Sequence, residues 1–176
     1  AGASTGPLTV TVSIGVAASA ACPVVVVRGA QPGADDTRPV VLGIDGTPLS
    51  EAAIAFAFEA AAARRVPLVA VHTWLEELND PALADLVDWQ SAAVQAEELL
   101  AERLAGWGEK YPDVPVQRLV AHGSAGHALL DQAARAQLVV VGTRGHGEIA
   151  GLLLDSVSNA LVHGAACPVA IVRAAA

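Results

Sequence analysis

Residues 138–147 read LVVVGTRGHG, a short apolar run that opens directly into a glycine-rich loop. A run of four apolar residues bounded by glycine is typical of a strand buried on both faces. Gly142 and Gly145 let the backbone approach a ligand closely, and the free N–H groups of the helix that follows favour an anion. The stretch therefore predicts a buried parallel strand with a binding loop at its carboxyl end.

The same alternation of apolar strand and helix extends in both directions from this stretch. The expected strands are residues 40–44, 67–72, 114–121, 138–141 and 169–172, and the expected helices are residues 47–65, 81–110, 124–136 and 153–164. The strand at residues 114–121 is expected nearest an edge, and Thr47 before Pro48 is the expected N-cap of the first helix. Strands separated by helices require a parallel sheet with right-handed crossovers and helices on both faces.

The composition agrees with a buried α/β sheet and argues against several classes of partner. Hydrophobic residues make up 53% of the 176 residues and aromatic residues only 3%, so Ala, Val, Leu and Ile must fill the core. The formal charge is -8, from 18 acidic and 10 basic residues, and Lys110 is the only lysine. An acidic surface without a basic cluster repels phosphate backbones, so we expect no nucleic-acid partner.

One phrase occurs twice in the chain, with an offset of 145 residues. Residues 21–28 read ACPVVVVR and residues 166–173 read ACPVAIVR. The repeat predicts that residues 1–29 are the last helix and strand of a first domain copy, residues 30–38 a linker, and residues 39–176 a complete second copy. Cys22 and Cys167 take equivalent places as small apolar side chains, and antiparallel pairing of the two strands would keep them too far apart for a disulfide.

The uncharged N-terminal stretch, residues 1–27, does not favour a targeting segment. It lacks a basic start, and Gly15, Pro23 and the valine run at residues 24–27 oppose a membrane helix. We expect a cytoplasmic protein with no membrane partner.

Four segments together resemble the universal stress protein family: GIDGTP at 43–48, VAVHTW at 69–74, VVVGTRGHG at 139–147 and SVSNALVHGAACPVAIVR at 156–173. The resemblance covers residues 38–173. It implies a Rossmann-like, adenine nucleotide alpha hydrolase-like fold with five strands in the order 3-2-1-4-5. It also implies the C-terminal domain of a tandem protein whose N-terminal domain is truncated. Because the final strands of this family pair with each other, we expect Val24–Val27 to pair with Val169–Val172, within the chain or in a homodimer.

The resemblance also implies an ATP site. Family members that bind ATP carry G-x2-G-x9-G-[ST] after the fourth strand; here Gly142, Gly145 and Ser156 match, but Asp155 replaces the third glycine. The residues implied at the nucleotide are Gly43, Asp45, Thr73, Glu76, Gly142, Thr143, Arg144, Gly145, His146, Gly147, Asp155, Ser156, Val157 and Ser158.

Asp155 leaves two hypotheses open. Its carboxylate is an N-cap of the last helix, or it lies beside the phosphates, where two unit charges about 4 Å apart cost about 4 kcal/mol unless Mg²⁺ bridges them. Other predicted contacts have structural alternatives as well. Asp45 suits a helix-entry turn, Thr73 strand-end packing, and Arg144 either a phosphate contact or a solvent-exposed position.

The sequence thus predicts a non-enzymatic stress-response protein that binds ATP, with or without Mg²⁺. The alternative is a family member that has lost nucleotide binding through Asp155 and acts by dimerisation or partner binding. A third hypothesis is a serine hydrolase, because HGSAG at residues 122–126 is close to a nucleophile elbow around Ser124. Ser124 is better explained as a helix N-cap, and we expect neither a catalytic constellation nor a metal site.

Overall fold

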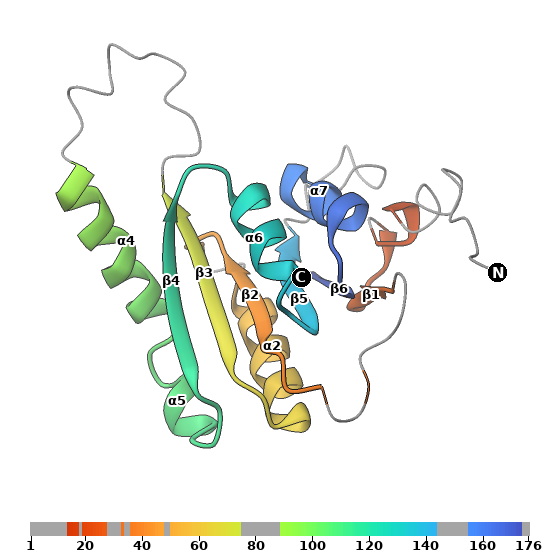
Figure 1. Cartoon of the computed structure of the whole chain (residues 1–176), viewed down its shortest axis with the longest axis horizontal. Coiled ribbons are helices and arrows are strands. Elements are labelled where there is room, and N and C mark those ends of the chain that lie inside the picture. The colour runs from red at the N-terminus through yellow and green to blue at the C-terminus, as the bar shows by residue number, and fades with distance from the viewer. Residues whose placement is uncertain are drawn as a thin grey trace, which may run out of the picture.

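The computed structural model describes residues 14–17, 19–27, 33, 36–47, 50–74, 89–143 and 155–173. Strands and helices alternate along most of this length (Figure 1). The elements are β1 (Val24–Val26), β2 (Val40–Ile44), α2 (Glu51–Arg64), β3 (Leu68–Trp74), α4 (Trp89–Arg103), α5 (Trp107–Lys110), β4 (Val116–His122), α6 (Ala125–Ala133), β5 (Leu138–Thr143), α7 (Ser156–Gly164) and β6 (Val169–Arg173). Residues 14–17 are also helical.

The strands form one sheet in the order β1-β6-β5-β2-β3-β4. The expected mainly parallel α/β sheet is confirmed, because β2 to β6 pair in parallel. The expected count of five strands is wrong, and the complete order differs from the expected one. A sixth strand, β1, pairs with β6 and extends the sheet, whereas β2 to β6 alone run β4-β3-β2-β5-β6. Strand β4 lies at an edge, as predicted.

Helices cover both faces of the sheet, and alternate strand residues fill two separate cores. One core packs α2, α4 and α5 against Leu42, Leu68 and Val140. The other packs α6 and α7 against Val41, Val139 and the rest of the opposite face. Valine and leucine occupy both faces because a parallel sheet between two helical layers has no solvent-facing side. None of the helices in the described ranges is long and apolar enough to cross a membrane.

Two predicted helices differ from the observed ones. The first begins at Glu51 with Ser50 as N-cap, so the prediction of Thr47 as N-cap is wrong. The helix expected at residues 81–110 is divided into α4 and α5, and residues 81–88 lie outside the described residues. The break occurs at Gly106, whose φ of 80° is incompatible with continuing a right-handed helix.

The predicted pairing of the two copies of the repeated phrase is confirmed within the chain. Strand β1 runs antiparallel to β6, with Val24 opposite Ile171, Val25 opposite Ala170 and Val26 opposite Val169. Cys22 and Cys167 are both free, as expected, although Cys22 is exposed and only Cys167 is buried. The pairing satisfies an edge of β6 that would otherwise present unpaired backbone groups.

Candidate functional site

The parallel register brings the ends of the central strands to one edge of the sheet. Gly43 lies between Val71 of β3 and Val141 of β5, so the residues that follow these three positions emerge side by side. Asp45, Thr73, Gly142 and Thr143, all predicted site residues, are therefore at the same carboxyl edge. Helix α7 connects parallel strands β5 and β6, so it also begins at this edge (Figure 1). Such an edge, where neighbouring strands lead to opposite faces, is where open α/β sheets bind ligands.

Asp45 organises the turn between β2 and α2. Its Oδ1 atom accepts hydrogen bonds from the Thr47 N–H at 2.9 Å, the Thr47 hydroxyl at 2.8 Å and the Ser50 hydroxyl at 2.5 Å. The alternative of a helix-entry turn is thus confirmed for Asp45. It also explains why Thr47 does not cap α2, since its hydroxyl bonds back to Asp45. The Asp45 side chain is exposed, so a turn role and contact with a ligand are compatible.

Gly43 has a packing reason to be glycine. A Cβ at this position would lie 2.9 Å from Leu129 Cδ1 of α6 and 3.2 Å from Val141 Cγ1 of β5. Both distances are shorter than ordinary carbon contacts. The lack of a side chain at Gly43 therefore lets α6 pack closely on the sheet beneath the candidate site.

His72 is a buried residue of this edge that the sequence analysis did not assign to the nucleotide site. His72 is 8% exposed, and its Nδ1 atom lies 2.8 Å from the Ile44 carbonyl oxygen. Because a carbonyl only accepts hydrogen bonds, Nδ1 must carry the proton in this contact. The bond ties the end of β3 to the residue immediately before Asp45. In the sequence, this role is indicated by a histidine at the last buried position of an otherwise apolar strand.

The start of α7 contains the most informative polar contacts of the site. Asp155 is the N-cap residue, and its Oδ1 accepts a hydrogen bond of 2.7 Å from the Ser158 N–H. The N-cap hypothesis for Asp155 is thus confirmed. Ser156 is exposed, Val157 is half-buried and Ser158 is fully buried. The Ser158 hydroxyl oxygen has no hydrogen-bond partner among the described residues.

Only some of the remaining predicted site residues lie within the residues that the structure describes. Thr73 is half-buried at the end of β3, Gly142 is half-buried, and Thr143 is 6% exposed at the end of β5. Glu76, Arg144, Gly145, His146 and Gly147 lie outside the described residues. Within the described ranges, no group of three or more His, Cys, Asp or Glu side chains is arranged to hold a metal ion.

Ser124, the candidate hydrolase nucleophile, is exposed and occupies the N-cap position of α6. Its side chain makes no capping hydrogen bond, so only the position, and not the bond, matches the N-cap hypothesis. The ring of His122, two residues before Ser124, packs edge-on against Trp74, with centroids 5.2 Å apart.

Comparison with known proteins gives consistent matches along most of the chain. The family model described as the universal stress protein family matches residues 37–173. Universal stress proteins of Mycobacterium tuberculosis and Mycobacterium bovis are each 46% identical over 166 residues, covering 92% of this chain and 55% of theirs. The chain thus spans about half the length of these curated relatives.

Solved structures show the same fold. The universal stress protein UspA from Lactobacillus plantarum superposes with a TM-score of 0.64 at 19% identity, covering 79% of this chain and 100% of that one. A universal stress protein solved in complex with cAMP superposes with a TM-score of 0.52 at 23% identity, covering 79% of this chain and 99% of that one.

Proposed function

Since the chain belongs to the universal stress protein family, we propose that it is a non-enzymatic stress-response protein that binds ATP at the carboxyl edge between β2 and β5. The support is the meeting of Asp45, Thr73 and Gly142 at that edge with the start of α7. One structural relative was solved with cAMP, an adenine nucleotide, although its likeness to this chain is one of fold.

The observation that carries this proposal is the polar start of α7. The first N–H groups of a helix lack partners within the helix and carry partial positive charge, which suits phosphate oxygens. Ser156 adds an exposed hydroxyl in the same turn, and the buried Ser158 hydroxyl has no hydrogen-bond partner among the residues that the structure describes. We assign the phosphates to Ser156, Val157 and Ser158, and the base and ribose to Thr73, Glu76 and Asp45.

A second candidate function follows from Asp155. Its carboxylate already accepts the Ser158 N–H, one of the donors that a phosphate would use. It also places a negative charge where the phosphates would lie. This contact favours a family member that does not bind nucleotide and acts through dimerisation or binding to other proteins. Under the first proposal, Mg²⁺ held by Asp155 and the phosphates offsets the repulsion.

Binding of Mg-ATP to three proteins separates the two candidates: the unaltered chain, Asp155→Asn and Asp155→Gly. Asparagine keeps an N-cap oxygen without the charge, and glycine is tolerated at an N-cap with a loss of only a few tenths of a kcal/mol. Both variants should therefore remain folded, so that a change in ATP binding does not reflect unfolding. Isothermal titration calorimetry measures the binding. If the unaltered chain binds ATP, the first proposal is supported.

Two other results would contradict the proposal that this chain binds ATP. Binding by the two variants alone would show that Asp155 excludes ATP, which favours the second candidate. Binding by none of the three would remove ATP as a ligand of this chain. Omitting Mg²⁺ gives a further comparison, because the unaltered chain should lose more affinity than Asp155→Asn if the ion bridges the Asp155 carboxylate.

A further inference from the structure

A second group of polar and apolar side chains lies at the end of the sheet opposite the candidate site. Leu138 begins β5, Pro168 directly precedes β6, and Arg64 is the last residue of α2, which leads to the start of β3. Because β1 runs antiparallel to β6, its final residue also reaches this end, and Val27 follows it. The topology therefore gathers these side chains where strands β2 to β6 begin (Figure 1).

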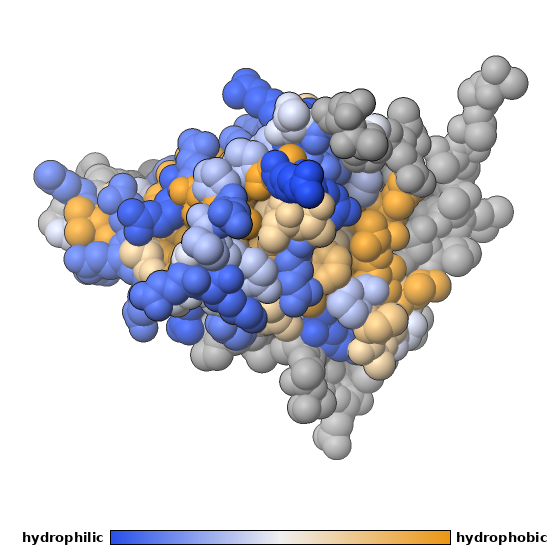
Figure 2. All heavy atoms as spheres, turned by 90° about the horizontal axis from the view of Figure 1, so that it is seen from below, coloured by the Kyte–Doolittle hydropathy of each residue, from blue (hydrophilic) through white to orange (hydrophobic). Residues whose placement is uncertain are grey.

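These residues line a cavity of about 640 Å³. Sites for small molecules in proteins usually have volumes of about 300–1,000 Å³, so this cavity has the size of a ligand site. Its walls come from α2, from β1 and from the segments that precede β2, β5 and β6. Figure 2 shows this end of the molecule, with hydrophobic residues gathered on the side where β1 lies in Figure 1 and hydrophilic residues beside them.

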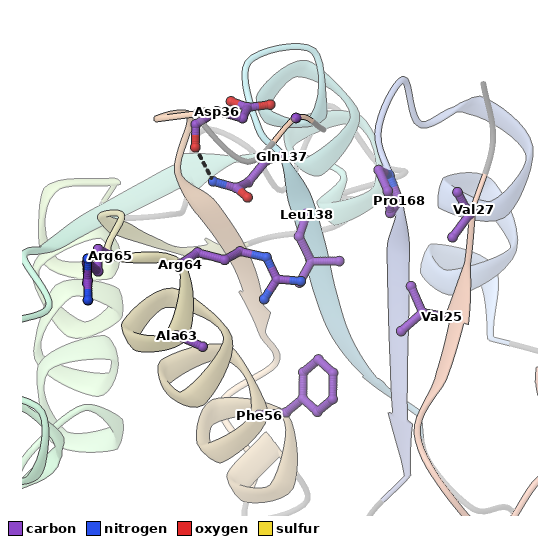
Figure 3. A pocket seen from close by; sticks show the side chains of 11 residues that line it. Val25, Val27, Asp36, Phe56, Ala63, Arg64, Arg65, Gln137, Leu138 and Pro168 are labelled. Atoms are coloured by element: carbon purple, nitrogen blue, oxygen red, sulfur yellow. Dashed lines mark hydrogen bonds between the residues drawn. The ribbon is translucent and has the colours of Figure 1, made fainter. Parts of the chain in front are cut away.

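One part of the cavity lining is apolar. Val25 is 47% exposed and Val27 is 46% exposed, whereas Phe56 of α2 is half-buried and Leu138 is buried. Figure 3 shows the Phe56 ring on the α2 side of the cavity and the two valines on the β1 side. An apolar molecule between these two sides would remove hydrophobic surface from water, which favours its binding.

Arg64 supplies a cation beside this apolar lining. Figure 3 shows its side chain extending from the end of α2 toward Leu138. Its Nη1 atom donates a hydrogen bond of 3.1 Å to the Ala60 carbonyl oxygen, which holds the guanidinium against its own helix. Among the described residues, no carboxylate forms an ion pair with Arg64. Its remaining N–H donors suit a carboxylate, which a guanidinium binds through two parallel hydrogen bonds.

The acidic residue of the described lining, Asp36, does not neutralise this cation. Its Oδ2 atom lies 2.6 Å from Arg38 Nη2, and hydrogen bonds from the Arg38 side chain and backbone hold the pKa of Asp36 below its ordinary value. Gln137, which is 4% exposed, donates hydrogen bonds of 3.0 Å and 2.6 Å to the carbonyl oxygens of Asp36 and Arg38 (Figure 3). With Arg64 and Arg65 in the lining, the cavity is locally basic, although the chain has a formal charge of -8.

We propose that this cavity binds a small monocarboxylate with an apolar body, such as a straight-chain fatty acid. The carboxylate pairs with the Arg64 guanidinium, and the apolar body lies between Phe56 and the valines of β1. A polyanion such as a nucleotide would place charge against the valines, and a neutral hydrocarbon would leave the guanidinium without an anion. The site lies at the opposite end of the sheet from the proposed ATP site and does not depend on it.

An NMR titration of the isotope-labelled full chain with octanoate, without nucleotide, tests the proposal. Octanoate should shift the amide signals at the end of α2 and the start of β5 in a saturable manner. Arg64→Gln should weaken binding about 10- to 100-fold, because it removes charge-assisted hydrogen bonds. Arg65→Gln is the matched control: it removes the same charge from the next residue, whose side chain lies on the other side of the helix end in Figure 3. It should weaken binding less than about threefold.

The uncharged analogue 1-octanol separates the two parts of the ligand. Its affinity should be the same for the unaltered chain and for Arg64→Gln, because it offers no carboxylate. Absence of saturable shifts with octanoate would overturn the proposal, as would shifts confined to the carboxyl edge of the sheet. Equal losses of octanoate affinity in Arg64→Gln and Arg65→Gln would also overturn it, because they would indicate general attraction of an anion.

A second pair of variants tests the apolar side without altering either arginine. Val27→Asp places a carboxylate in the lining just beyond β1, where it should repel octanoate and abolish the saturable shifts. Val94→Asp is its matched control, because it adds the same charge at a valine of α4 that is 50% exposed. Native circular dichroism confirms that each variant is folded. Undiminished octanoate binding by folded Val27→Asp would overturn the proposal, and this pair decides even if Arg64→Gln fails to fold.

Discussion

Leu99 of α4 packs directly against Gly46, so that a Cβ on Gly46 would lie 2.7 Å from Leu99 Cδ2. Gly46 also has a φ of 80°, a conformation that side chains disfavour. The turn after Asp45 is therefore held by its own hydrogen bonds from within and by α4 from outside. This contact fixes the edge of the candidate site to α4.

Replacement of Gly46 by alanine should destabilise the protein by about 1–3 kcal/mol, because it combines a left-handed residue with overpacking against Leu99. Urea denaturation followed by circular dichroism measures the change. Gly108→Ala is the control, since a Cβ there meets nothing within 4 Å, and it should change the free energy of unfolding by less than about 1 kcal/mol. Equal effects of the two substitutions would contradict the packing argument.

Gly43→Ala should also destabilise the fold by about 1–3 kcal/mol, because the new methyl group would press on Leu129 and Val141. Combining it with Leu129→Val should recover part of this loss, and a double-mutant cycle measures that coupling. Gly126→Ala in α6 is the matched control, because its nearest contact would be an ordinary 3.5 Å to Ala160 Cβ. An unchanged stability of Gly43→Ala would mean that the site, rather than packing, requires glycine there.

Asp155→Ala should lower the free energy of unfolding by about 0.5–2 kcal/mol, because the Ser158 N–H loses its N-cap acceptor. Asp155→Asn should stay close to the unaltered chain in the same denaturant titration. A loss of equal size in both variants would show that the charge, and not the capping bond, provides the stabilisation.

The two cysteines should differ in reactivity and in their effect at alkaline pH. Burial raises the pKa of the Cys167 thiol above its ordinary value of 9.0, although nearby Arg38 and backbone N–H groups oppose this. The native protein should therefore show one thiol, Cys22, that reacts quickly with a disulfide reagent, and a second that reacts only on unfolding. Fast modification of both thiols would contradict the burial of Cys167.

The sign of the pH effect follows from the raised pKa. The stabilisation due to protonated Cys167 should be fully present below pH 9.0 and should decrease as the pH rises through the folded-state pKa. Cys167→Ala should remove this part of the alkaline dependence. Denaturant titrations of both proteins between pH 7 and pH 10 would measure the difference.

The positions of the strands β2 to β6 and the parallel sheet were predictable because short apolar runs beside glycine or proline are typical of buried strands. It failed where a local contact decided the outcome. Thr47 had the chemistry of an N-cap, but Asp45 engages its hydroxyl, and α2 begins later. The break between α4 and α5 depends on the positive φ of Gly106, which helical periodicity does not reveal.

For the candidate site, too, the sequence predicted the position of residues but not their local contacts. The sequence identified Asp45, Thr73 and Gly142, and the parallel register places them at one edge. The hydrogen bond from His72 to Ile44 was not foreseeable, because it joins adjacent strands that are separated by a whole helix in the sequence. The choice between the two hypotheses for Asp155 required the geometry of a single side chain.

The pairing of Val25 with Ala170 has a consequence for biosynthesis, because its two partners are 145 positions apart. At about 5–20 residues per second, the ribosome makes β6 on the order of ten seconds after β1. During that time the valine run at residues 24–27 cannot make its pairing with β6. Such an uncharged, β-branched segment is prone to aggregate, so the yield of native protein should depend on chaperones that shield the nascent chain.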